Sequence, residues 1–464
     1  MGGVRLARSC PAMRVARRSL GNPQLTWRLA VVSVALAACA QSAAQQGDST
    51  RVREGDVAAA PPGPVRYALP TYAPAVLRDS TPADSATERA TFDTAATAAW
   101  SYIDHNYVPA TGMVLATPTW PYPTVWDIGS MLLAYHAGHA LGFLSDSAYH
   151  DHALRLMTTM KQAHLYRGFT FGRSYDARTG ALVRDDGHVD AVGSGYSSVD
   201  LGRFLIALAI AATDDPALTA AARDVARRVD GSRVLKDGYL TGNLVNPRTG
   251  DFDAYAEGRL GYEQYSAEGF ALWGMHPALA MNVSLNARPA KVLDIPITAD
   301  KRGNDRLTSE PFVLHGLEVG WSPTVSELAL QTLSAQARRY ERTGFVTIAS
   351  EDAVDRAPYY FYYFCVYCNG KPFVVSTTNP AITLQSPHWV STKAAFAWYA
   401  LLPSKYTWLG VQAVRPALDS SAGWSSGVYE SSKQSTHSYD VNTAAVILEA
   451  ALYRRTGGPL LSHR

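Results

Sequence analysis

One pattern recurs at three places along the 464-residue chain: an aspartate directly precedes apolar residues spaced for one face of a helix. The aspartates are Asp127, Asp200 and Asp440, and apolar residues follow each of them at positions i, i+3, i+4 and i+7. The first two segments align at a constant offset of 73 residues. Such a repeat predicts stacked helical hairpins, and in one domain of this length it favours an (α/α) toroid whose inner helices point their ends at a central cleft.

The rest of the chain agrees with a mainly α fold. Further helical stretches are predicted over 86–106, 145–163, 216–230, 257–274, 323–342, 391–401 and 405–414, with a few short β-hairpins between them. No composition shift marks a second linker after residue 84. We therefore expect an (α/α)6-type toroid as a single domain over residues 84–464.

Residues 1–38 have the composition of a sorting signal. They hold six arginines, no acidic residue and an apolar run over 29–38, which is too short for a span of about 20 residues but typical of a signal peptide. The ending Leu36-Ala37-Ala38-Cys39 resembles the bacterial lipobox, which implies cleavage before Cys39 and lipidation of that residue. The alternative is an ordinary signal peptide cleaved nearby. Residues 39–83, rich in Pro and Ala, are predicted to form a flexible tether.

The charge balance excludes one class of function. The chain has 42 basic and 40 acidic residues, a formal charge of +2, which argues against nucleic-acid binding. Without residues 1–38 the basic residues fall to 36 and the balance to −4. We expect an exported protein, lipid-anchored in the bacterial cell envelope, that contacts the membrane through its N-terminal lipid only. The sequence names no protein partner.

Cys365 and Cys368 remain after export and are spaced CxxC. In an oxidising compartment they are expected to form a disulfide. A strand is predicted before them and a turn after them, whereas a thioredoxin-like site would open a helix, so a structural disulfide is favoured over a redox site. Two cysteines are too few for structural zinc, and we predict neither a metal nor a cofactor.

Several carboxylates lie beside aromatic residues near loop-to-helix junctions. Trp126 directly precedes Asp127, and Tyr262 and Tyr265 lie on either side of Glu263. Phe312 lies two residues after Glu310. Trp424 begins another aromatic segment, which ends at Glu430. Aromatic rings beside carboxylates are typical of sugar sites, because CH-rich sugar faces stack on rings. Each residue also has a simpler interpretation: the aspartates cap their helices, and the tryptophans pack in the core.

These segments together resemble the bacterial domain of unknown function 3131, over about residues 90–460. The segments that carry the resemblance are Thr124-Val-Trp-Asp-Ile-Gly-Ser130, Ala140-Leu-Gly-Phe-Leu-Ser145, Val199-Asp-Leu-Gly-Arg203, Gly261-Tyr-Glu-Gln-Tyr265, Ser309-Glu-Pro-Phe312, residues 423–430, and Asn442-Thr443. The resemblance implies an envelope-associated helical domain with no settled activity. The expected architecture is also similar to the (α/α)6 clan that contains bacterial β-1,2-glucanases, which is an analogy of fold.

Glycoside hydrolysis needs one protonated carboxylic acid and one carboxylate. Because a helix N-terminus lowers the pKa of an acid, Asp127 suits a base, and Glu263 or Glu310 in an apolar setting suits the acid. Residues expected to bind a polysaccharide or oligosaccharide are Trp126, Asp200, Arg203, Tyr262, Tyr265, Trp424, Glu430 and Asn442. Arg203 has an alternative role in a salt bridge with one of the acids. The second functional hypothesis is a non-catalytic lipoprotein that binds or scaffolds envelope polysaccharide.

Overall fold

The structure is a computed structural model that describes residues 67–80, 84–246, 249, 252–379 and 381–461. The predicted signal peptide, Cys39 and residues 39–66 of the predicted tether lie outside these ranges. None of the described helices is long and apolar enough to cross a bilayer.

Six helices form an inner ring in which each helix contacts the next and the last contacts the first. In ring order they are α3 (Val125–Leu141), α5 (Ser198–Asp214), α8 (Tyr262–Leu272), α11 (Glu310–Glu318), α13 (Thr392–Leu401) and α15 (Val441–Thr456). Every residue of α11 and α13 is buried. These helices are covered on all sides, which is why apolar residues exceed a single face along them.

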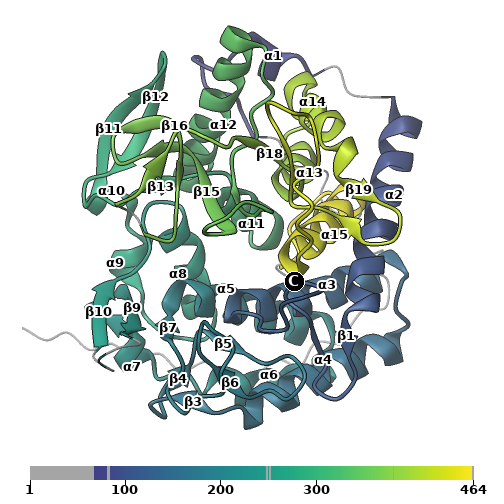
Figure 1. Cartoon of the computed structure of the whole chain (residues 1–464), viewed down its shortest axis with the longest axis vertical. Helices are drawn as coiled ribbons and strands as arrows, with labels where there is room; N and C mark the ends of the chain where they lie inside the picture. The colour runs from purple at the N-terminus through teal and green to yellow at the C-terminus, as the bar shows by residue number, and fades with distance from the viewer. Residues whose placement is uncertain (1–66, 81–83, 247–248, 250–251, 380, 462–464) are drawn as a thin grey trace, which may run out of the picture. The chain divides into compact units, whose positions relative to one another are not determined.

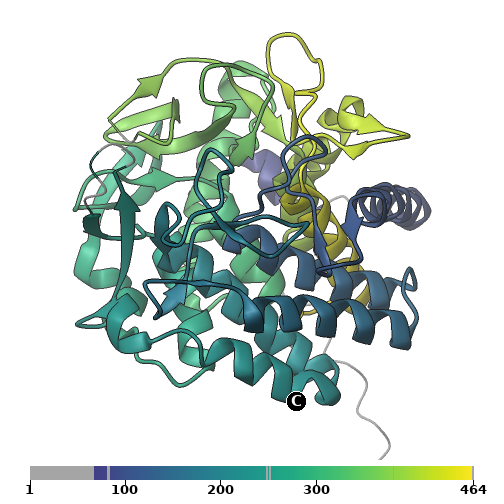
Figure 2. The same cartoon turned by 60° about the horizontal axis from the view of Figure 1, so that its bottom comes forward.

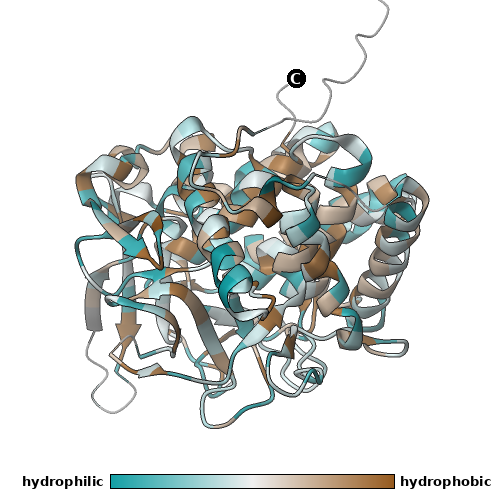
Figure 3. Ribbon diagram, turned by 90° about the horizontal axis from the view of Figure 1, so that it is seen from above, coloured by the Kyte–Doolittle hydropathy of each residue, from teal (hydrophilic) through white to brown (hydrophobic). Residues whose placement is uncertain are grey.

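An outer layer of amphipathic helices packs around the ring (Figures 1 and 2). It consists of α2 (Ser85–His105), α4 (Asp146–Gln162), α6 (Thr219–Ala226), α12 (Pro323–Thr343) and α14 (Lys405–Ala413). Hydrophobic and hydrophilic stretches alternate along helices at the periphery in Figure 3, as one-sided burial requires. Short elements complete the layer: α1 (Ala75–Arg78), α7 (Gly231–Val234), α9 (Ala278–Met281), α10 (Val283–Asn286), and the 3-10 turns Pro216–Leu218 and Arg415–Ala417. The predicted (α/α)6-type toroid is confirmed.

Two small antiparallel sheets lead into inner helices. One pairs β10 (Phe252–Ala256), β9 (Tyr239–Val245) and β7 (Gly195–Ser197), with β8 (Leu235–Lys236) on β9. The other has the order β13 (Arg306–Leu307), β15 (Phe361–Cys368), β16 (Lys371–Ser376), β17 (Thr383–Leu384), with β14 (Glu351–Ala353) on β15. The register of β14 and β15 places Glu351 opposite Tyr363. Cys365 and Cys368, both buried in β15, form a disulfide.

The remaining strands pair in two-stranded antiparallel sheets. They are β1 (Tyr107–Val108), β2 (Met113–Val114), β3 (Leu165–Tyr166), β4 (Thr170–Phe171), β5 (Ser174–Tyr175), β6 (Leu182–Val183), β11 (Ala287–Val292), β12 (Ile295–Asp300), β18 (Trp389–Ser391), β19 (Leu418–Asp419), β20 (Gly423–Trp424) and β21 (Gly427–Tyr429).

Two local predictions need correction. Residues 67–80, expected in the flexible tether, pack on the domain: Leu77 is buried, and the Tyr67 and Trp321 rings lie 4.5 Å apart. Asp127 and Asp200 do not precede their helices but lie in the first turn, where Thr124 and Ser197 are the N-caps. Asp440 is an N-cap and accepts a 2.7 Å hydrogen bond from the backbone N–H of Thr443.

Candidate active site

The first turns of the inner helices meet at one end of the ring. Asn442 of α15 donates to Glu310 of α11 (2.8 Å), and Lys393 of α13 forms an ion pair with the same carboxylate (2.5 Å). Ser266 of α8 donates to the carbonyl of Val199 in α5 (3.0 Å). Trp126 of α3 lies with its ring centroid 6.2 Å from that of Tyr262. The repeat predicts a central cleft at this end of the ring, and we refer to these helix starts as the cleft.

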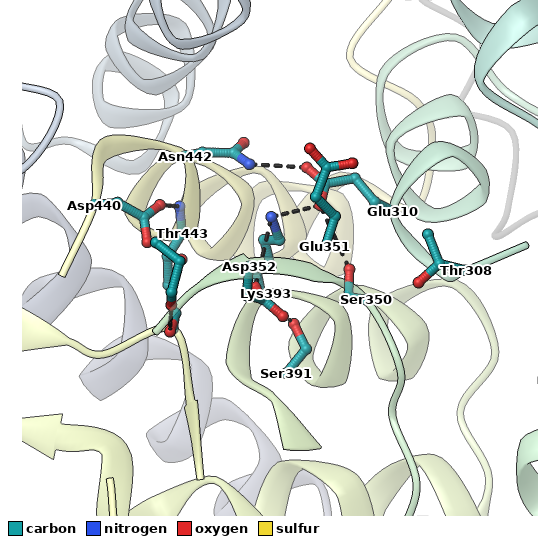
Figure 4. A network of polar contacts seen from close by, with 12 residues as sticks. Thr308, Glu310, Ser350, Glu351, Asp352, Ser391, Lys393, Asp440, Asn442 and Thr443 are labelled. Carbon is teal, nitrogen blue, oxygen red and sulfur yellow. Dashed lines mark hydrogen bonds and ion pairs between the residues drawn. The ribbon is translucent and has the colours of Figure 1, made fainter. Parts of the chain in front are cut away.

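Glu310 is the buried hub of the contacts in Figure 4. Besides Lys393 and Asn442 it accepts a 3.4 Å hydrogen bond from the hydroxyl of Ser350. Lys393 is itself buried, and burial lowers its pKa. The carboxylates of Glu310 and Asp352 outweigh burial, so the pKa of Lys393 is raised above its ordinary value. Glu310 is therefore held as a paired carboxylate, which suits a fixed charge better than a proton donor.

Glu351, which sequence reasoning missed, has the properties expected of the acid. It is partly exposed, stands beside Glu310 in Figure 4 and accepts a hydrogen bond from the hydroxyl of Tyr262. Burial, followed by the charge of Glu310, raises the pKa of Glu351 to about 8. Its carboxyl group is consequently protonated at neutral pH, as a general acid must be.

Asp352, the next residue of β14, is buried and supports the same cluster. Its carboxylate accepts hydrogen bonds from the Trp389 indole N–H (2.7 Å) and the Ser391 hydroxyl (3.1 Å), and Lys393 Nζ lies 3.6 Å away. Burial raises the pKa of Asp352 to about 7. Asp352 thus fixes the lysine that pairs with Glu310.

Asp127 is partly exposed at the start of α3. One carboxylate oxygen accepts from both the backbone N–H (2.8 Å) and the hydroxyl (2.9 Å) of Thr124. Burial raises the pKa of Asp127, the hydrogen bonds of Thr124 oppose this effect, and Asp440 and Asp200 add repulsion, so the pKa is raised rather than lowered as predicted for a helix start. The resulting pKa is about 6. Asp127 is therefore more acidic than Glu351 and is mostly ionised at neutral pH.

Asp200 belongs to a second cluster on the β7–β9 side. Burial and the neighbouring Glu257 raise the pKa of Asp200 to about 7. Glu257 accepts hydrogen bonds from the backbone N–H groups of Ser198 (2.5 Å) and Val199 (3.2 Å), which caps α5, and Arg173 lies 3.8 Å from it. Asp200 therefore connects this cluster to Asp127, on which it acts by repulsion.

Glu263, one of the two predicted acids, is engaged elsewhere. Both of its oxygens accept from Arg302, at 3.1 and 2.6 Å, and the same guanidinium pairs with Asp300. The side chain is 1% exposed. The clamp leaves Glu263 without access to substrate, and we do not retain it as the acid.

Arg203 and Tyr265 lie beneath the cleft rather than in it. The fully buried guanidinium of Arg203 donates to Ser130 (2.8 Å), Asn442 (2.5 Å), Glu318 (3.2 Å) and Glu449 (3.1 Å). The hydroxyl of Tyr265 donates to Glu318 (2.5 Å). Arg203 therefore forms salt bridges, but with Glu318 and Glu449 rather than with one of the candidate acids. It contacts the site through Asn442 and through Trp126, whose ring centroid lies 4.9 Å from the guanidinium carbon.

Trp424 and Glu430 are placed outside the cluster. The Trp424 indole donates to the carbonyl of Ala95 in α2 (3.1 Å), and its ring packs on Phe396. Glu430 pairs with Arg339 (2.5 and 2.9 Å), and despite burial the hydrogen bonds and charges of Arg339 and His388 lower its pKa to about 2. Trp424 thus packs in the core, as the simpler interpretation of the tryptophans has it, and Glu430 forms an ion pair that the sequence did not predict. Among the described residues no His, Cys, Asp or Glu cluster is arranged to hold a metal ion.

Solved structures share this architecture. An endo-β-1,2-glucanase from Chitinophaga pinensis, in complex with sophorotriose and glucose, aligns over 81% of this chain and 94% of its own at 12% identity and a TM-score of 0.57. A putative glucoamylase from Bacteroides fragilis aligns over the same shares at 13% identity and a TM-score of 0.57. An endo-β-1,2-glucanase from Talaromyces funiculosus with β-1,2-glucan covers 81% and 85% at 12% identity and 0.53. At these identities the likeness shows the fold.

No curated protein matches the sequence. A family model described as "Protein of unknown function (DUF3131)" matches residues 94–457, from α2 to the end of α15. The match contains all six inner helices and every carboxylate of the cleft, and the chain therefore belongs to the DUF3131 family.

Proposed function

We propose that this protein is a glycoside hydrolase that acts on polysaccharide, with Glu351 as general acid and Asp127 as base. One observation carries the proposal: the cleft holds two partly exposed carboxyl groups whose surroundings set their pKa values about 8 and about 6. Two carboxyl groups whose pKa values differ in this way can act as acid and base at the same pH. Solved glucanases with the same fold supply further support.

In this mechanism Glu351 donates its proton to the glycosidic oxygen as the C–O bond breaks. Asp127 removes a proton from the water that forms the new bond to the anomeric carbon. Both groups regain their starting states when the proton passes from Asp127 to solvent and Glu351 is reprotonated. The buried Glu310 does not exchange protons in this scheme; its fixed charge keeps Glu351 protonated until the leaving oxygen arrives.

The charges of the cleft favour a substrate without anionic groups. Asp440 and Asp200 act on Asp127 by repulsion, and Glu257 acts in the same way on Asp200. Glu351 is likewise repelled by the buried Glu310. Arg173 is paired with Glu257, and Arg306 stacks over the Tyr363 ring at 4.0 Å. A uronate or sulfated sugar would meet excess negative charge, whereas the hydroxyl groups of a neutral glycan would donate to these oxygens.

We further propose that the enzyme works as an exported lipoprotein of the bacterial envelope. The basic and apolar signal over residues 1–38 and Cys39 at its end support this location. The Cys365–Cys368 disulfide fits an oxidising compartment. Metabolic labelling with a palmitate analogue should mark the wild-type chain and not Cys39→Ala.

The test of hydrolysis is release of reducing ends by the purified protein from linear β-1,2-glucan, starch, laminarin, xylan and polygalacturonate. Glu351→Gln and Asp127→Asn should each lower kcat by about a hundredfold to ten-thousandfold. Glu263→Gln, assayed well below its melting temperature, should keep most of the activity and serves as the control. Loss of activity in Glu263→Gln and Asp127→Asn, with activity retained in Glu351→Gln, would restore Glu263 as the acid. Glycan binding without cleavage by any variant would favour the binding lipoprotein.

A further inference from the structure

The loop between β2 and α3 contacts the starts of two inner helices. At one end the carbonyl of Ala116 accepts a 3.1 Å hydrogen bond from the backbone N–H of Val441, the first residue of α15. At the other end Thr124 caps α3 and bonds Asp127. The loop therefore joins two inner-helix starts, and Trp120 lies between its two anchored ends.

Trp120 is the one tryptophan classed as exposed in the part of the chain that the structure describes, with 43% of its surface accessible. Its ring meets the edge of Tyr122, with centroids 4.9 Å apart and planes at 83°. Neither ring has a place in the catalytic scheme. The exposed Trp120 ring, backed by the half-buried Tyr122, offers an apolar face on which a CH-rich sugar ring can stack.

Both rings are held in place before any ligand binds. The backbone of Trp120 exchanges hydrogen bonds with Thr117 at 3.1 and 3.3 Å, and the carbonyl of Pro121 accepts from Ala177 at 2.9 Å. Gly187, at φ +83°, packs so closely that an added Cβ would lie 2.3 Å from a ring carbon of Tyr122. A rigid aromatic surface binds with a small loss of conformational entropy.

We propose that Trp120 and Tyr122 form a distal sugar subsite that stacks on a neutral pyranose ring of the glycan chain bound in the cleft. The loop leads from this pair directly to Trp126 and Asp127, so a chain that occupies the catalytic centre reaches the pair along the same segment. The inference rests on the proposed hydrolase function. It adds that the site is built for a polymer rather than a short oligosaccharide, because the subsite lies beyond the reacting bond.

The test combines Trp120→Ala and the conservative Trp120→Phe with the inactive Glu351→Gln background. Affinity electrophoresis measures binding of linear β-1,2-glucan and the other polymers, and sophorotriose serves as the short probe. Trp120→Ala should weaken polymer binding about three- to tenfold while leaving the trisaccharide unchanged, and Trp120→Phe should retain binding. The control is Leu272→Ala, an exposed apolar residue at the opposite end of α8, which should change neither.

The outcomes separate the subsite from the hydrolase. Cleavage with equal polymer affinity in wild type and Trp120→Ala overturns the subsite and keeps the hydrolase. Polymer binding that depends on Trp120 without cleavage keeps the subsite and overturns hydrolysis. No binding and no cleavage of any probe overturns both. Polymer protection of wild-type tryptophan fluorescence against acrylamide, absent in Trp120→Phe, gives an independent readout.

Discussion

Neighbouring groups give Glu310 and Glu351 different chemistry although both are glutamates in the same cleft. Glu310 faces Lys393 at 2.5 Å and the amide of Asn442 at 2.8 Å, so a buried charge is fully paired. Glu351 faces that paired carboxylate and one tyrosine hydroxyl, and it keeps its proton. The lysine therefore acts on the acid indirectly, by holding a negative charge beside it.

At the residue scale, Tyr262→Phe tests this electrostatic assignment. The Tyr262 hydroxyl bonds the ionised form of Glu351 and so lowers its pKa, against the larger effect of burial. The wild-type profile of kcat/KM should be a bell with limbs near the pKa values of about 6 for Asp127 and about 8 for Glu351. In Tyr262→Phe the alkaline limb should move to higher pH.

The control for that profile is Tyr196→Phe, whose hydroxyl contacts Thr241 instead (2.8 Å). Its pH profile should coincide with that of the wild type. An alkaline limb that stays in place in Tyr262→Phe, with activity retained, would show that another group donates the proton.

The roles of single residues were the least predictable from sequence, because their partners lie far along the chain. The sequence from Val346 to Val354 around Glu351 contains no aromatic residue. The pKa of Glu351 depends on burial and on Glu310 and Tyr262, which only the fold brings close. Glu263 has aromatic neighbours in the sequence, but in the fold its carboxylate forms an ion pair with Arg302. The burial of Asp127 could not be read from its helix-start position either.

At the element scale, the repeated Asp-x-Gly segment has a structural explanation that the periodicity did not provide. Its glycines lie where inner helices cross. An added Cβ on Gly129 of α3 would lie 3.2 Å from the backbone of Phe204 in α5, and one on Gly202 of α5 would lie 2.3 Å from the carbonyl of Ser266 in α8. Helix starts and spacing could be predicted because they depend on local sequence; the close crossings depend on neighbours around the ring.

Gly202→Ala should therefore separate α5 from α8. The added methyl group meets backbone rather than a movable side chain, and the overpacking should cost about 1–3 kcal/mol or more. Thermal unfolding followed by circular dichroism should show a lower Tm. Gly458→Ala, which meets nothing within 4 Å, should leave the Tm unchanged. Equal Tm values in the two variants would rule out a close crossing at Gly202.

At the scale of the whole molecule, buried carboxyl groups make stability depend on pH. The folded-state pKa values of Glu351 (about 8), Asp200 (about 7) and Asp352 (about 7) exceed the ordinary 4.5 and 3.8. The folded state thus binds protons that the unfolded state has lost, and stability falls as pH rises through these values.

The Tm should therefore decrease between about pH 6.5 and pH 8.5. Buried His315, with its pKa lowered to about 4, acts in the opposite sense only below its ordinary 6.5, outside this window. Glu351→Gln should flatten the upper part of the decrease. A Tm that rises across the window would contradict the protonation states on which the mechanism depends.

Arg203 connects the inner ring below the cleft, since its guanidinium on α5 contacts α3, α11 and α15 through Ser130, Glu318, Asn442 and Glu449. Burial and the neighbouring Glu318 raise the pKa of Glu449 well above its ordinary value. Removing Arg203 leaves buried acceptors and an unpaired charge. Arg203→Met should therefore destabilise the fold by about 3–5 kcal/mol, measured as a loss in Tm.

The triple variant Arg203→Met, Glu318→Gln, Glu449→Gln separates structure from catalysis. With no buried charge left it should regain much of the lost stability, because removing all partners is less costly than removing one. Asn442 would still lack its 2.5 Å contact with the guanidinium and would hold Glu310 less firmly. We therefore expect a near-normal Tm with a lowered kcat. Recovery of both would show that Arg203 stabilises the ring without positioning the site, and recovery of neither would show that the ring requires the charge itself.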